Sequence, residues 1–245
     1  MRAIIVDTET TGLFPRGIKN VSMANLDVFP FIVQFSYLIC NNNEIDKIVN
    51  HVIRLPGHVI MDGDNMKIHK ITNEESKKNG VDLKNVLLEF VEDLKGVNYV
   101  VGHNVEFDWL TIKAELHRLT RTYLNTNEHL TYWGYIDQMT LVTSKLYCTM
   151  KESTKLCNIT EKRADGSTYV KWPSLDQLHH HLFGVTPLNL HNSLNDVIVT
   201  FRCFYKLRVK ADICDENPEM VILMKKVLPT ASSLIQTNVS SSSST

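Results

Sequence analysis

The sequence lacks a surplus of either charge. Its 26 Lys and Arg residues are balanced by 27 Asp and Glu residues, for a formal net charge of −1. Non-specific binding to nucleic acid comes mostly from neutralisation of phosphates by Lys and Arg, so the balance argues against a protein that coats DNA. It leaves room for an enzyme whose bound metal ions meet the phosphate.

The sequence also lacks a cysteine framework and a long apolar run. Its five cysteines are odd in number and show no C-x-x-C spacing, which predicts reduced thiols. No signal segment opens the chain, because Asp7 and Glu9 interrupt the first apolar stretch. No run approaches the length of a membrane span. We therefore expect an intracellular protein, cytoplasmic or nuclear, without a membrane partner.

What is present is an ordinary globular composition. The 245 residues are 43% hydrophobic and 22% charged, enough for one large domain with a sizeable core. Apolar patterns predict strands at residues 2–6, 31–40, 48–55, 99–102 and 141–148. Helical spacing is found at residues 87–94, 109–119, 175–182, 197–207 and 220–228.

The order of these elements predicts an α/β fold. It indicates a mixed five-stranded sheet flanked by helices, in which residues 31–40 and 48–55 form an antiparallel hairpin. Residues 120–140 and 151–172 carry no firm pattern, and we predict that both are insertions. No internal repeat is visible.

Four acids lie where an acid is expensive to place. Asp7 and Glu9 directly follow the apolar residues 3–6, and residues two apart on a strand face the same side. Asp108 and Asp196 each open a helical pattern. Carboxylates gathered beside a core repel each other and lose hydration, so a positive group must compensate. A pair of divalent metal ions would do so, and would indicate phosphoryl-transfer chemistry.

Each acid also has a simpler explanation. Asp7 and Glu9 can merely begin a surface loop, and Asp108 suits the first turn of any helix. Residues 193–196 match a capping box with Ser193 as the N-cap, which would explain Asp196. Topology favours the interpretation that the four acids form one site. The helices that Asp108 and Asp196 open both begin near strand ends, where open sheets place their sites.

Three segments resemble the motifs of the DEDDh exonuclease family, which contains the proofreading subunit of bacterial replicative DNA polymerase. Residues 7–12 (D-T-E-T-T-G) resemble the first motif, residues 103–108 (H-N-V-E-F-D) the second and residues 191–196 (H-N-S-L-N-D) the third. Residues 68–72 (I-H-K-I-T) are similar to the family's I-H-G-I-T segment, with Lys70 in place of Gly. The resemblance runs from residue 3 to about residue 208.

The resemblance implies a ribonuclease H-like fold and 3′-to-5′ hydrolysis at a strand end. It implies two divalent cations, Mg²⁺ or Mn²⁺, bound by Asp7, Glu9, Asp108 and Asp196. It assigns the general base to His191, and an imidazole titrates near neutral pH. The expected substrate contacts are Thr8, Thr10, Thr11, Gly12, Leu13, His69, Asn104 and Phe107.

Two other features have plain explanations. The triplet His179–His181 is not expected to bind a metal, because consecutive helical residues point in different directions. Cys148 stands where family members commonly carry an acid, and we expect a buried inert thiol there.

We expect an exonuclease domain at residues 1–210, a helical extension at 211–228 and a disordered Ser-rich tail at 229–245. The leading hypothesis is a metal-dependent exonuclease that acts on single-stranded or frayed DNA 3′ ends in proofreading or repair. Proofreading would need a separate polymerase as partner. An RNA 3′-end trimming enzyme is the alternative, and a catalytically silent nucleic-acid-binding module is a third hypothesis.

Overall fold

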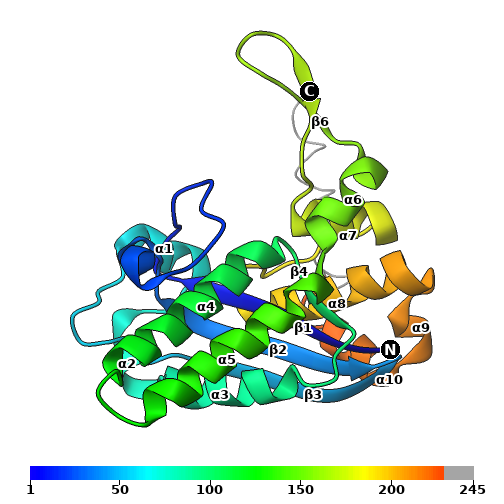
Figure 1. The fold of residues 1–245 in the computed structure, drawn as a ribbon. Helices are drawn as coiled ribbons and strands as arrows, with labels where there is room; N and C mark the ends of the chain where they lie inside the picture. The colour runs from blue at the N-terminus through cyan, green and yellow to red at the C-terminus, as the bar shows by residue number, and fades with distance from the viewer. Residues whose placement is uncertain (229–245) are drawn as a thin grey trace.

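A computed structural model describes residues 1–228; the expected Ser-rich tail lies outside this range. A mixed five-stranded sheet forms the centre of the protein, in the order β3-β2-β1-β4-β5, with helices on both faces (Figure 1). The strands are β1 (Arg2–Thr10), β2 (Ile32–Asn41), β3 (Glu44–Val52), β4 (Tyr99–Gly102) and β5 (Leu146–Cys148). The predicted five-stranded mixed sheet is therefore confirmed.

Two kinds of pairing meet at β1. On one side, β1, β2 and β3 are antiparallel, with a tight turn at Asn42 between β2 and β3, as predicted. On the other side, β1, β4 and β5 run parallel. Strand β1 extends four residues beyond the predicted end at residue 6. Asp7 and Glu9 therefore belong to the strand rather than to a loop after it.

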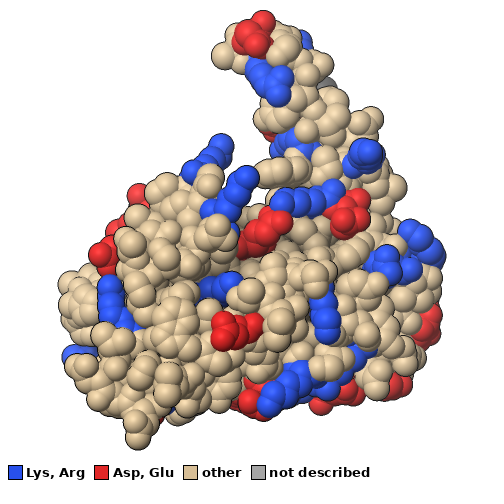
Figure 2. Space-filling view, in the orientation of Figure 1, with Lys and Arg blue, Asp and Glu red and all other residues tan. Residues whose placement is uncertain are grey.

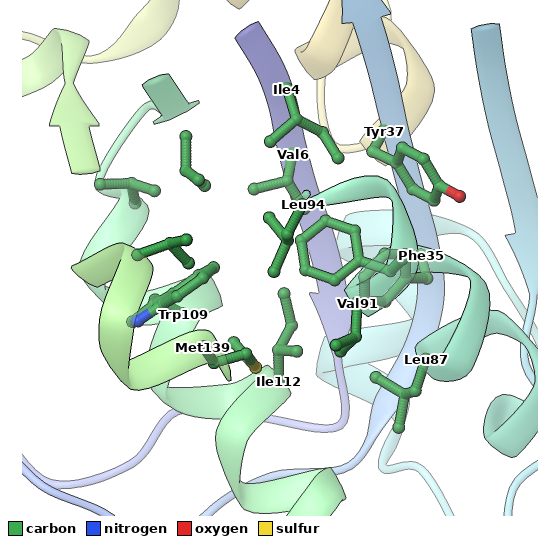
Figure 3. Close-up of a cluster of buried hydrophobic side chains, with 14 of the residues drawn as sticks. Ile4, Val6, Phe35, Tyr37, Leu87, Val91, Leu94, Trp109, Ile112 and Met139 are labelled. Atoms are coloured by element: carbon green, nitrogen blue, oxygen red, sulfur yellow. The ribbon is translucent and has the colours of Figure 1, made fainter. Parts of the chain in front are cut away.

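Alternating residues of β1 face two separate cores. Ile4 and Val6 pack against α3 (Leu83–Asp93), α4 (Val105–Thr122) and α5 (Glu128–Val142), and Figure 3 shows part of this cluster. Ala3 and Ile5 pack against the helices on the opposite face, α7 (Leu175–Phe183), α8 (Ser193–Val209) and α10 (Pro218–Met224). The sheet is thus buried on both faces at β1, which fixes the direction of every β1 side chain.

The prediction of an insertion at residues 120–140 was wrong. Helix α4 continues to Thr122, and α5 packs along it with Tyr132, Ile136 and Met139 buried. The exposed apolar residues Leu130 and Leu141 hide this spacing in the sequence. Since α5 continues to Val142, the fifth strand is also shorter than predicted and begins only at residue 146.

Residues 151–172 contain two elements that the sequence did not reveal. Helix α6 (Thr149–Cys157) packs against α7 and α8. A two-stranded antiparallel hairpin follows, formed by β6 (Thr160–Lys162) and β7 (Thr168–Val170). Figure 1 shows that this hairpin projects from the body of the protein. Only the hairpin and its flanks resemble the predicted insertion.

The remaining elements are short. They are η1 (Met23–Val28), α1 (Gly63–His69), α2 (Asn73–Asn79), η2 (Thr143–Lys145) and α9 (Ile213–Glu216). Helix α7 ends at Gly184 with φ 72°, as the sequence predicts for a helix stop. Within residues 1–228, no helix has the length and apolar character needed to cross a bilayer.

Candidate active site

Three of the four predicted acids meet where β1 extends past its parallel neighbour. Pairing between β1 and β4 ends at Ile5 and Val101, and the chain leaves β4 at Gly102. Asp7 and Glu9 follow on the last residues of β1 and face the side of the sheet covered by α8. Carboxylate oxygens of Asp7, Glu9 and Asp196 all lie within 4.8 Å of one another.

Asp196 is brought to this group by the first turn of α8. The backbone N–H of His191 donates to Asp196 Oδ2 at 3.0 Å. The N-cap of α8 is Asn192, not Ser193 as predicted, and its side chain accepts from the N–H of Asn195. Ser193 instead forms a 2.6 Å hydrogen bond with Ser36 of β2. The helix therefore begins one residue earlier than predicted, and Asn192 rather than Ser193 caps it. The Asp196 carboxylate still points towards the acids of β1.

Asp108 approaches from the other face of the sheet. It lies in the first turn of α4, and its Oδ1 accepts both the N–H of Thr8, at 2.9 Å, and the Thr8 hydroxyl, at 2.8 Å. Because β4 has already ended, this carboxylate satisfies a strand N–H that would otherwise be unpaired. Asp108 is not one of the three acids whose oxygens converge, although it is close enough to raise the pKa of Asp7.

The pKa values of all four acids are raised. Burial, followed by the charges of Asp108, Asp196 and Glu9, raises the pKa of Asp7 well above its ordinary value. Burial raises the pKa of Glu9 to about 7 and that of Asp196, with help from the Glu9 charge, to about 8. Burial also raises the pKa of Asp108 to about 7, against the opposing effect of the Thr8 hydrogen bonds.

The acid group fits divalent cations. Within residues 1–228, no Lys or Arg forms an ion pair with any of the four acids. The available donors are all carboxylate oxygens, which Mg²⁺ and Mn²⁺ prefer. A bound cation would supply the positive charge that the protein itself does not place there.

His191 lies on the loop before α8, as the sequence predicted. It is exposed and its φ is 65°, a left-handed conformation unusual for a histidine. It lines a cavity of about 490 Å³ together with His69 and Lys70. His69 is buried, its Nδ1 accepts from the N–H of Ile71, and its Nε2 has no hydrogen-bond partner within residues 1–228.

The other predicted contact residues divide into two sets. Thr10 and Thr11 shape the turn after β1: the Thr10 hydroxyl donates to the Gly12 carbonyl, and the Thr11 hydroxyl accepts from the N–H of Phe31. Thr8 faces Asp108, as described above. The second set lines a separate groove beside the acids: Leu13, Asn104 and Phe107.

Two other histidines, the buried His179 and the half-buried His103, have structural roles. The Nδ1–H of His179 donates to the Val185 carbonyl, and its Nε2 lies 3.2 Å from Arg202, so this member of the histidine triplet is already engaged. His103 contacts the Thr149 hydroxyl and the Pro173 carbonyl, each at 3.0 Å. Burial lowers the pKa of both imidazoles to about 4, so both are neutral at pH 7.

The fold and this site define a nuclease. A family model named RNase_T and described as an exonuclease matches residues 4–204. The chain therefore belongs to this exonuclease family, a group of nucleic-acid hydrolases. No curated protein sequence matches the chain.

Solved structures of exonucleases share the fold. Exonuclease X in complex with 5′ overhanging duplex DNA superposes with a TM-score of 0.50 at 18% identity, covering 85% of this chain and 92% of that chain. E. coli exonuclease I in complex with a dT13 oligonucleotide superposes with a TM-score of 0.55 at 15% identity, covering 90% of this chain and 45% of that chain. Exonuclease I from Methylocaldum szegediense superposes with a TM-score of 0.54 at 16% identity, covering 84% of this chain and 40% of that chain.

The chain thus spans less than half the length of these exonuclease I chains. At such low identities the likeness shows the fold alone. It supports the predicted ribonuclease H-like α/β architecture.

Proposed function

We propose that the protein is a metal-dependent 3′-5′ exonuclease that releases nucleotides from single-stranded or frayed DNA ends, in proofreading or repair. The observation that carries this proposal is the convergence of three carboxylates within 4.8 Å, with no Lys or Arg of residues 1–228 paired to them. Such a group is unfavourable in its charged form unless cations bind it, and without cations it takes up protons instead. Membership of the exonuclease family supports the same reaction class.

In this proposal, Asp7, Glu9 and Asp196 bind two divalent cations, Mg²⁺ or Mn²⁺, and Asp108 completes the set from the other side of the sheet. Cations bound there would acidify the attacking water and stabilise both the attacking and the leaving oxygen. Thr8 keeps one Asp108 oxygen in place through two hydrogen bonds, so only the second oxygen of Asp108 is free to bind.

His191 acts as the general base. Its side chain is exposed beside a cavity. Its backbone N–H donates to Asp196, which holds the backbone of His191 next to one of the proposed metal-binding carboxylates. It would take the proton of the attacking water and release it to solvent. His69, with a buried and unpartnered Nε2, lies in the wall of the same cavity and is proposed to contact the substrate.

DNA is the proposed substrate for two reasons. Residues 7–12 resemble the DNA-proofreading branch of the family, and two of the three similar exonucleases described above were solved with DNA. RNA 3′-end trimming remains the alternative, because RNA-processing relatives share the four acids. Residues 1–210 would form the exonuclease domain and residues 211–228 a helical extension. A proofreading role requires a separate polymerase.

The decisive experiment is digestion of oligonucleotides labelled at the 3′ or the 5′ end. The substrates are single-stranded DNA, a duplex with a mismatched 3′ end, and RNA of the same sequence, each with Mg²⁺ or with a chelator. We expect the 3′ label to be released as mononucleotide at once, and the 5′-labelled strand to shorten stepwise. Faster cleavage of RNA would favour the alternative. Activity of Asp7→Ala equal to the wild type would reject the proposed site.

A further inference from the structure

A groove runs beside the acids, between the loop after β1 and the projecting hairpin. Its volume is about 900 Å³, and residues 13–14 and 16–18 form one wall while residues 161 and 169–172 form the other. Figure 2 shows this face hollowed between the hairpin and the body of the protein, with Lys and Arg side chains on both sides.

The groove has aromatic walls. Phe14 and Phe107 stack with their ring centroids 5.1 Å apart and their planes 4° from parallel. Tyr169 and Trp172 face the groove from the hairpin side. Trp172 is 59% exposed, and within residues 1–228 no aromatic ring or cation lies against it. Leu13, at the rim, is 85% exposed. Large apolar side chains exposed together around a hollow indicate a binding surface.

The acids of the groove are neutralised by the protein itself. Glu106 is paired with Lys151, and Glu161 is paired with Lys171 at 2.8 Å. Arg16 also lines the groove and has no ion-pair partner within residues 1–228. The surface therefore presents stacking rings and a free guanidinium without an unpaired carboxylate, which suits a chain of bases joined by phosphates.

The groove adjoins the turn of α4 that carries Asp108. Asn104, Glu106 and Phe107 line it from the start of α4, and Asp108 is the next residue of the same turn. A strand whose last phosphate reached the acids would therefore continue past Phe107 towards the hairpin. A duplex keeps its bases stacked inside, whereas single-stranded DNA can offer base faces to protein rings.

We propose that the hairpin β6–β7 is the second wall of a channel for single-stranded DNA, with Trp172 and Tyr169 stacking on bases upstream of the terminal nucleotide. This inference rests on the proposed exonuclease function. Tyr169 is fixed for this role, because its hydroxyl donates to Glu161 at 3.0 Å and Arg163 lies 4.7 Å from its ring centroid.

The test compares a long substrate with one that cannot reach the hairpin. The long substrate is a 20-nucleotide oligo(dT), and the short one is the nitrophenyl ester of thymidine 5′-monophosphate. Stacking on one aromatic ring contributes about 1–3 kcal/mol, so Trp172→Ala should lower the ratio of kcat/KM for the oligomer to that for the ester by roughly 5-fold to 150-fold. Trp172→Phe keeps a ring and should recover most of the ratio.

The matched control is Trp133→Ala. Trp133 is 37% exposed on α5 and does not line the groove, so this variant should keep the wild-type ratio. Equal effects of Trp172→Ala and Trp133→Ala would overturn the inference. So would a ratio unchanged in Trp172→Ala.

A binding measurement separates this inference from the proposed function. In a Trp133→Phe background the remaining tryptophans are Trp172 and the buried Trp109. Oligo(dT) added together with a chelator should quench the fluorescence of the exposed Trp172. This quenching should be lost in Trp172→Phe. Quenching without hydrolysis of either substrate would reject the exonuclease proposal and keep the channel. Hydrolysis without quenching, or quenching by RNA alone, would reject the channel.

Discussion

Thr8 holds Asp108 through two donors, its backbone N–H and its hydroxyl, which meet the same carboxylate oxygen at 2.9 and 2.8 Å. The two residues are 100 positions apart, and they lie on different elements. The bond takes the place of a sheet hydrogen bond that β4 is too short to make. A strand end thus fixes the orientation of an acid that arrives from a helix, and Thr8 acts as a positioning residue.

Replacement of Thr8 should weaken the site without unfolding it. Thr8→Val keeps the shape and the backbone N–H but removes the hydroxyl donor. A hydrogen bond to a charged group contributes about 1.5–3 kcal/mol, so we expect cation affinity or kcat/KM to fall roughly 10-fold to 100-fold. Thr10→Val is the control, because its hydroxyl donates to the Gly12 carbonyl and not to an acid. Equal losses in the two variants would contradict the positioning role.

Cation binding should release protons. Glu9 and Asp108, with pKa values of about 7, and Asp196, with a pKa of about 8, hold protons near neutral pH, and cations bind the deprotonated forms. Affinity for Mg²⁺ should therefore rise between pH 6 and pH 9. Titration calorimetry at pH 7 in buffers of different ionisation enthalpy would measure the release. Binding with no proton release in any buffer would contradict the raised pKa values.

The same groups should make the metal-free protein sensitive to alkali. Their pKa values are higher in the folded state than in the unfolded state, where carboxyl groups titrate near 4. The stability they contribute is complete below about pH 4 and is lost as pH rises through 7 and 8. The Tm of the chelated protein should fall from pH 6 to pH 9, and Mg²⁺ should raise Tm more at pH 9. Asp196→Asn should reduce both effects.

His191 and Asp196 should separate catalysis from cation binding. His191→Ala is expected to lower kcat by roughly two to four orders of magnitude while cation affinity is retained. Because φ is 65° at this position, His191→Asn is the better variant, since Asn adopts the left-handed region more readily than Ala. Asp196→Asn should lose both kcat and affinity. Equal losses of affinity in the His191 and Asp196 variants would show that His191 is a ligand.

The backbone at Lys70 should be strained, and a glycine at this position should relieve the strain. It ends α1 with φ 62°, where a glycine adopts the same conformation without a Cβ penalty. Lys70→Gly is expected to raise the free energy of unfolding by about 0.5–1 kcal/mol in a urea titration, less than the full penalty because glycine also gains entropy when unfolded. Lys67→Gly, inside α1, should lower it by about 1 kcal/mol. Destabilisation of similar size in both variants would show that Lys70 makes stabilising contacts.

The sequence predicted the elements whose apolar pattern is strong and local. Strand β1, the β2–β3 hairpin and β4 follow from short buried runs, and α7 from its spacing and its glycine stop. Helix α5 was missed because exposed Leu130 and Leu141 blur the period of its buried face. The hairpin β6–β7 was missed because most of its residues are exposed and polar, so no core pattern marks it.

The site shows the same division. The pairing of Asp7 with Glu9 could be predicted because strand alternation is a local property. The approach of Asp196 was expected only from topology and from the resemblance to the family. The Thr8–Asp108 bond could not be, because it depends on where β4 ends relative to β1. The cap of α8 was misplaced by one residue, since Asn192 and Ser193 are both good caps and only the contact with Ser36 engages Ser193 elsewhere.

The hairpin is closed at its base. The N–H of Lys171 donates to the Ile159 carbonyl at 2.8 Å, and below it His103 bridges Thr149 and Pro173 through its two ring nitrogens. The segment between Ile159 and Lys171 therefore leaves the body of the protein and returns to the same place. Its length and sequence can change over evolution without shifting a strand of the five-stranded sheet or one of the four acids. If the hairpin binds the substrate strand as proposed, substrate preference can diversify in this arm while the chemistry stays constant.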